Sequence, residues 1–122
     1  MKIKMLPLLL VAAANTFAMN AKADTKSIVS QMSTIYCDYR YSETIYNLQD
    51  KSIKYIGRNS SDVTPMLRLQ LDEQNETVTI YSISFGNVVT KTFKVNGNPY
   101  KAGFTDTYIV SLGSDECHGT LK

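Results

Sequence analysis

The chain has 122 residues, of which 43% are hydrophobic and 20% charged, with 13 Lys and Arg against 11 Asp and Glu. Three of the basic residues lie within the first 23 positions, so the rest of the chain carries ten basic against eleven acidic side chains. This balance excludes the strongly basic surface of a nucleic-acid-binding protein, and the length fits one domain with a single core.

The first 23 residues have the layout of a secretory signal peptide. Lys2 and Lys4 flank the start of an uncharged, apolar segment over residues 5–14, and Ala21-Lys22-Ala23 supplies the small residues of a cleavage site. The apolar segment is shorter than the roughly 20 residues that span a bilayer. We therefore predict export and cleavage after Ala23, with Ala18 as the alternative site.

After cleavage, residues 24–122 are expected to form one domain in the periplasm or outside the cell, and no segment in it is long and apolar enough to enter a membrane. Residues 24–32 are compatible with a short helix in which Ile28 and Met32 are four residues apart. From there the apolar period is two: Ile35, Cys37, Tyr39 and Tyr41 alternate with more polar residues, as in a half-buried strand. The other expected strands cover residues 44–48, 52–56, 66–71, 77–85, 88–95, 107–112 and 116–121, and residues 100–104 are a further candidate that Gly103 interrupts.

The segments between these strands carry turn signals. Gln49-Asp50-Lys51 and Gly86-Asn87 are typical of hairpin turns, residues 57–65 are predicted to form a loop, and the sequence 96–99 (Asn-Gly-Asn-Pro) predicts a tight turn. Within residues 77–85 the alternation changes phase, which indicates either a β-bulge near Ile80-Tyr81 or a strand buried on both faces. The whole pattern predicts an all-β domain, a small antiparallel barrel or sandwich of about seven or eight short strands, with a possible short N-terminal helix.

Cys37 and Cys117 are the two cysteines of the chain. In an exported protein two cysteines most simply form one disulfide, here between the first and last strands of the domain. The spacing is not the Cys-x-x-Cys of a redox pair, and two cysteines with one histidine do not supply a zinc site. We therefore predict a structural disulfide, no metal site and no cofactor.

No catalytic constellation is evident in the sequence, so we predict that the protein is not an enzyme. His118 is the single histidine, lies beside Cys117 and has the outward parity of its strand. The acidic clusters at residues 72–76 and 115–116 fall in predicted turns, where Asp and Glu are expected and where nothing separates two carboxyl pKa values. The first cluster also lacks the pattern of a calcium loop.

Tyrosine is the one compositional bias of the domain. Five of the eight tyrosines fall in the first three expected strands: Tyr36, Tyr39, Tyr41, Tyr46 and Tyr55. Tyrosine is favoured in strands, where packing is its usual role, and it is also favoured in recognition surfaces because it joins apolar area to a polar tip. These five residues are the predicted binding surface.

Parts of the sequence are similar to the periplasmic inhibitors of c-type lysozymes. These parts are Tyr36-x-Asp38 around Cys37, then Phe104-Thr105-Asp106, Tyr108-Ile109-Val110 and Asp115-Glu116. The resemblance implies a small β-barrel with one disulfide between early and late strands, and an inhibitory role. The chain has Ala102-Gly103 where those inhibitors carry Ser-Gly, and Gly113-Ser114 where they carry a lysine.

About 20 residues also resemble the opening hairpin of the receptor-binding B subunits of enterotoxins. They include Cys37, Ile45-Tyr46, Asp50-Lys51 and Tyr55. Those subunits contain a long central helix, whereas residues 88–110 here predict strands.

Taken together, the sequence predicts a small exported, non-enzymatic binding module. Its expected partner is a protein or a peptidoglycan-associated molecule, and inhibition of a cell-wall-directed enzyme such as lysozyme is the most specific form of this hypothesis. The alternatives are a subunit of a secreted or surface complex and, in a different class, a small hydrolase that uses the turn carboxylates.

Overall fold

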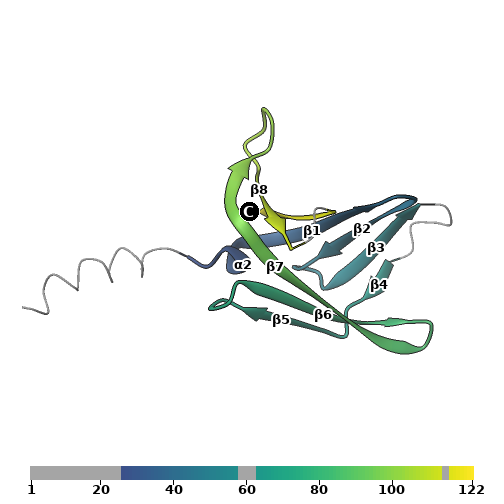
Figure 1. The fold of residues 1–122 in the computed structure, drawn as a ribbon. Coiled ribbons are helices and arrows are strands. Elements are labelled where there is room, and N and C mark those ends of the chain that lie inside the picture. Colours follow the sequence, from purple (N-terminus) through teal and green to yellow (C-terminus); the bar gives the residue numbers. More distant parts are fainter. Residues whose placement is uncertain (1–25, 58–62, 114–115) are drawn as a thin grey trace, which may run out of the picture.

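A computed structural model describes residues 26–57, 63–113 and 116–122; the expected leader lies outside these ranges. Within them the chain forms one antiparallel sheet of nine strands, curled into a half-barrel, and one short helix, α2 (Ile28–Gln31) (Figure 1). The strands are β1 (Met32–Tyr39), β2 (Ser42–Asn47), β3 (Ser52–Gly57), β4 (Val63–Pro65), β5 (Arg68–Asp72), β6 (Thr77–Ser84), β7 (Asn87–Lys101), β8 (Tyr108–Leu112) and β9 (Cys117–Leu121). Their order across the sheet is β4-β3-β2-β1-β9-β8-β7-β6-β5.

The predicted all-β class, the barrel-like architecture and the short helix are confirmed. The helix is a single turn whose N-cap is Ser27, and the side chain of Ser27 accepts a hydrogen bond from the amide of Ser30. The first strand therefore begins at Met32, earlier than the alternation indicated. The ninth strand is β4, which forms at the end of residues 57–65; the prediction of a loop was wrong for Val63–Pro65, and residues 58–62 lie outside the described ranges.

The predicted turn at residues 96–99 is wrong, because β7 runs through it. The first part of β7 pairs with β6 as far as Lys94, and the second part pairs with β8 from Val95 onward. The register with β8 shifts between Asn96 and Tyr100, where Gly97 has a φ of +93°. The turn-forming residues therefore bend the strand with a bulge instead of reversing it.

The predicted bulge at Ile80-Tyr81 is also wrong, as is burial on both faces. β6 keeps one register with β7 along its whole length and one register with β5 from Thr77 to Tyr81. Val78, Ile80 and Ser82 point into the barrel and are buried, while Tyr81 and Ile83 lie on the outer face. The change of phase within residues 77–85 therefore arises because apolar residues lie exposed on the outer face.

The core fills the inside of the curled sheet. Its fully buried side chains come from α2 and from strands of both halves of the sheet: Val29, Ile35, Cys37, Ile53, Val78, Ile80, Val110 and Leu112. Tyr46 packs edge-on against Phe93 across this core, with ring centroids 5.2 Å apart. Each of these strands contributes alternate residues, as the period of two requires.

The first and last strands of the domain form a seam that the disulfide closes. Cys37 in β1 and Cys117 in β9 are cross-strand partners, with Cα atoms 4.1 Å apart, and their bridge confirms the predicted pairing. Further along the same pair of strands, Ile35 faces Gly119, and Val110 of β8 faces the same glycine from the other side. The seam is thus tightly packed, because a Cβ on Gly119 would lie 2.5 Å from the Met32 sulfur.

Candidate binding surface

The five tyrosines of the predicted binding surface do not lie together on one face. Tyr46 is buried, and desolvation raises the pKa of its hydroxyl far above the ordinary value of 10. Tyr39 packs against the core from the same side, and Tyr55 lies opposite Thr44 on that side and is partly exposed. Tyr36 lies on the outer face, and Tyr41 lies in the β1–β2 turn.

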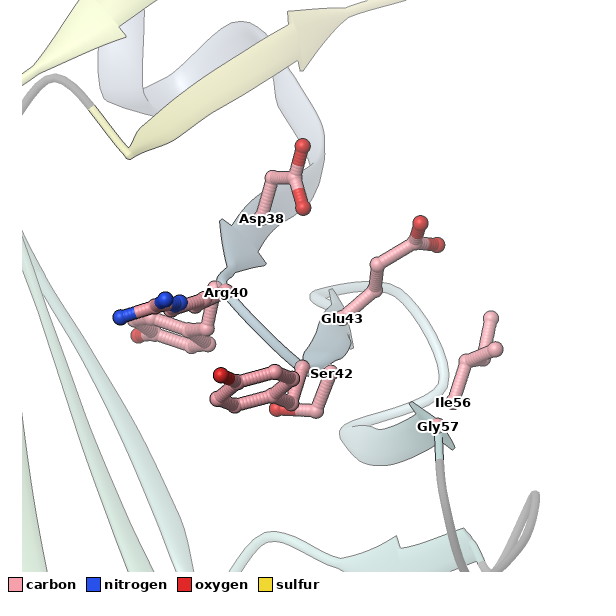
Figure 2. A pocket seen from close by; sticks show the side chains of 8 residues that line it. Asp38, Arg40, Ser42, Glu43, Ile56 and Gly57 are labelled. Carbon is pink, nitrogen blue, oxygen red and sulfur yellow. The ribbon is translucent and has the colours of Figure 1, made fainter.

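A shallow hollow of about 260 Å³ lies at the β1–β2 turn and the end of β3 (Figure 2). Asp38 and Glu43 are cross-strand partners there, and their carboxylates project on the same side in Figure 2. Beside them the pKa of Tyr36 is raised, first by desolvation and then by its hydrogen bond to Glu43. Small-molecule sites enclose most of their ligand in about 300–1,000 Å³, and this open hollow falls below that range.

In the acidic cluster at residues 72–76, two carboxylates accept hydrogen bonds from backbone amides and stabilise local structure. The Asp72 carboxylate accepts hydrogen bonds from the amides of Gln74 and Asn75, and bonds with Asn75 lower its pKa. The Glu76 carboxylate accepts bonds from the amides of Ile28 and Val29 at 3.0 Å each, which caps the N-terminus of α2. Both carboxylates thus have structural partners.

His118 lies half-buried on the outer face of β9. Its ring contacts Tyr36, with centroids 5.3 Å apart, and its cross-strand partners are Tyr36 and Ser111. The bonded Cys117 beside it is not a free thiol. The histidine thus lies in an aromatic contact on the sheet surface.

The β7–β8 hairpin projects away from the body of the half-barrel (Figure 1). Tyr100 pairs with Ile109, and Lys101 pairs with Tyr108, so Tyr100 and Tyr108 lie on opposite faces of the hairpin. Both are about half exposed, and Phe104 at the tip is fully exposed. The hairpin therefore presents aromatic surface on both faces and at its end.

Thr105 fixes the shape of this tip. Its hydroxyl donates to the carbonyl of Ala102 at 2.6 Å and accepts from the amide of Thr107 at 3.2 Å. The backbone amide of Thr105 also donates to the Ala102 carbonyl, and the amide of Ala102 donates to the Thr107 carbonyl at 2.8 Å. Gly103 supplies the positive φ of +59° that the turn needs. Phe104 is therefore held on a preorganised loop.

The β6–β7 hairpin forms a second exposed apolar tip. Ser84 and Asn87 are its last cross-strand pair, so Phe85 and Gly86 form a two-residue turn, one position before the predicted Gly86-Asn87. Ile83 and Val88 are paired next to it and are exposed. Phe85 is fully exposed and has a φ of +51°, a conformation that bulky residues rarely adopt.

The apolar periodicity of the sequence missed the residues at these two tips. It placed Phe104 at the end of a strand and counted Phe85 among the residues of another. The phase change in residues 77–85 was the signal for the second tip, since an apolar residue next to a turn glycine is exposed when the strand keeps its register.

The part of the chain that the structure describes contains neither a candidate metal site nor a candidate membrane-spanning helix. It contains no group of three or more His, Cys, Asp or Glu side chains able to hold a metal ion. None of its helices has the length and apolar character that crossing a membrane requires.

Comparison with protein-family models, with curated proteins and with solved structures finds no significant match to this chain.

Proposed function

We propose that this chain is an exported, non-enzymatic protein that binds another protein by inserting its β7–β8 hairpin into a cleft of the partner. The observation that carries the proposal is the fully exposed Phe104 at the tip, with Tyr100 and Tyr108 on opposite faces behind it. A hairpin with aromatic side chains on both faces buries more of them in a cleft than on a flat surface. Exposed aromatic anchors commonly dominate binding energy in protein interfaces.

Preorganisation of the tip supports the same proposal. The Thr105 hydrogen bonds hold the loop before any partner arrives, so less conformational entropy is lost when it binds. The Lys101–Asp106 ion pair, at 3.9 Å, joins the two sides of the hairpin and leaves this end without a dominant charge. The aromatic side chains would therefore supply most of the contact.

Export is part of the proposal. The leader at residues 1–23 would direct the chain to the periplasm or the outside, and the Cys37–Cys117 disulfide is compatible with an oxidising compartment. The partner class that we infer there is a wall-directed enzyme such as a c-type lysozyme, because the hairpin carries two of the stretches that resemble lysozyme inhibitors, Phe104-Thr105-Asp106 and Tyr108-Ile109-Val110. Since Ala102 replaces the serine of those inhibitors, contact would depend on Phe104 and not on a hydroxyl group.

The test measures lysis of bacterial cell walls by a c-type lysozyme in the presence of the exported protein. We expect inhibition, and we expect Phe104→Ala to raise the half-inhibiting concentration about tenfold or more. Phe85→Asn is the matched control, because it removes an equally exposed phenylalanine from the other hairpin and should leave inhibition unchanged. Lysis unaffected by the protein, with no wall-directed enzyme captured from the periplasm, would overturn the inhibitor hypothesis.

The second candidate is a subunit of a secreted or surface complex, and the β6–β7 tip favours it. Ile83, Phe85 and Val88 gather exposed apolar surface on that hairpin, as a docking contact would require. Loss of assembly with Phe85→Asn, and not with Phe104→Ala, would support this candidate over the first.

A further inference from the structure

The half-barrel leaves strand edges without partners in the described ranges, and these edges differ in how they are protected. β4 is three residues long and ends in Pro65, which has no backbone donor. The first half of β7 pairs only with β6, and Lys91 lies on it. Short length, proline and lysine are the usual means by which sheet edges avoid pairing with other chains.

β5 is longer than β4 and carries neither proline nor lysine. It lies at the end of the sheet, pairs only with β6 and has the sequence Arg-Leu-Gln-Leu-Asp. Leu71 in the strand is 41% exposed, and Leu67 just before it is 55% exposed. An edge of five residues with exposed leucines and no proline or lysine is a template for another strand.

The charges of β5 identify the strand that fits it. Arg68 and Asp72 lie at its two ends and on the same face, since they are four residues apart. When two copies of β5 pair antiparallel about Gln70, Arg68 of each copy lies opposite Asp72 of the other. No other antiparallel register of two identical strands brings this pair together. On the opposite face, the same register places Leu69 of each copy beside Leu71 of the other.

We propose that two copies of this chain form a symmetric dimer through β5, in the register centred on Gln70. The contact joins the two sheets edge to edge, with two Arg68–Asp72 pairs on the outer face and two Leu69–Leu71 pairs on the inner face. Arg68 already lies 4.1 Å above the Tyr81 ring in its own chain, which holds its side chain on the outer face. This self-association is separate from the β7–β8 hairpin and does not depend on its partner.

The experiment expresses the full chain, purifies the exported product and measures its mass by sedimentation equilibrium across a concentration series. We expect a reversible dimer that weakens as salt is added. In Arg68→Glu, each attraction becomes a repulsion at both symmetric positions, so the dissociation constant should rise about thirtyfold. Lys54→Glu makes the same charge change at an exposed residue of β3 and should leave the dimer unchanged.

The decisive arm mixes two variants that each repel their own copies. Asp72→Lys places a lysine opposite Arg68 and should weaken self-association as Arg68→Glu does. In a mixture of the two, the introduced glutamate of one copy lies opposite the introduced lysine of the other, and the remaining Asp72 lies opposite the remaining Arg68. This mixture should therefore form a heterodimer of near wild-type affinity.

Thermal melts of each variant verify folding, because Asp72 also caps its turn. A monomeric wild type at every concentration, or a mixture of folded variants that stays monomeric, would overturn the proposal.

Discussion

The β1–β9 seam and the two hairpins at the ends of β7 belong to the same sheet and have opposite character. In the seam, Ile35, Cys37 and Val110 are fully buried, and a disulfide joins the neighbouring strands. At the hairpin tips, Phe85 and Phe104 are fully exposed although phenylalanine is among the most buried residue types. The seam contributes stability, whereas the hairpin tips present apolar surface that folding does not bury.

The backbone shows the same division. Phe85 has a φ of +51°, at a turn position where asparagine or glycine would cost little. Its exposed ring recovers none of that cost through packing. A residue that is unfavourable for folding and fully accessible is better explained by a contact with another molecule than by stability. Substitutions in the two regions should therefore differ in size and even in sign.

The largest expected effect is loss of the seam disulfide. The bridge closes a loop with a sequence separation of 80, and chain entropy then assigns it about 4 kcal/mol of stability. The Cys37→Ala/Cys117→Ala double variant should unfold about 20 °C below wild type. Thermal melts followed by circular dichroism measure this, and wild type under reducing agent should melt with the double variant. A loss below about 1 kcal/mol would show that packing alone holds the seam.

The next effect concerns the close packing behind the disulfide. Gly119→Ala would place its Cβ 2.5 Å from the Met32 sulfur, so unfolding in urea should show a loss of about 2 kcal/mol. Gly113→Ala is the matched control, since the nearest atom to its Cβ is 3.9 Å away, and it should change little. In a protein that already carries Met32→Ala, Gly119→Ala should lower the free energy of unfolding by less than it does in wild type. Strict additivity of the two substitutions would contradict this account.

At the β6–β7 tip the sign should reverse. Phe85→Asn fits the positive φ better and should stabilise the protein by about 1 kcal/mol in urea unfolding. Phe85→Ala keeps the unfavourable backbone conformation and removes the same ring, so the difference between the two variants isolates the backbone contribution. A destabilised Phe85→Asn protein would mean that the ring packs in solution, and the contrast between the regions would fail there.

The seam was predictable from the sequence because it follows from the residue pattern within each strand and from the number of cysteines. Alternation placed Cys37 and Cys117 on the inward parity of the first and last strands, and two cysteines in a chain that is expected to be exported allow one pairing. The same alternation gave the strand-rich fold. It required only that the apolar side chains of each strand share a face.

The two ends of β7 were not predictable in this way, because they depend on which strands become neighbours. Asn96 to Pro99 carries strong turn chemistry, yet the partner change from β6 to β8 uses it as a bulge. The phase change before Phe85 predicted a bulge or a strand buried on both faces, whereas the register is regular and the apolar residues are exposed. Apolar periodicity assumes burial, so it misplaces apolar residues that the folded chain leaves exposed.

The smallest expected effect on stability is at the β7–β8 tip, where it tests whether the Phe104 ring contributes to folding. Phe104→Ala should change the free energy of unfolding by less than about 0.5 kcal/mol, because the ring has no intramolecular burial to lose. Thr105→Val is the contrasting variant, since it removes the hydroxyl that bonds Ala102 and Thr107. It should speed hydrogen exchange of the Thr107 amide, whereas Phe104→Ala should leave that rate unchanged. If Phe104→Ala alone loosened the tip, the ring would be part of the fold and would no longer be free to act as a binding anchor.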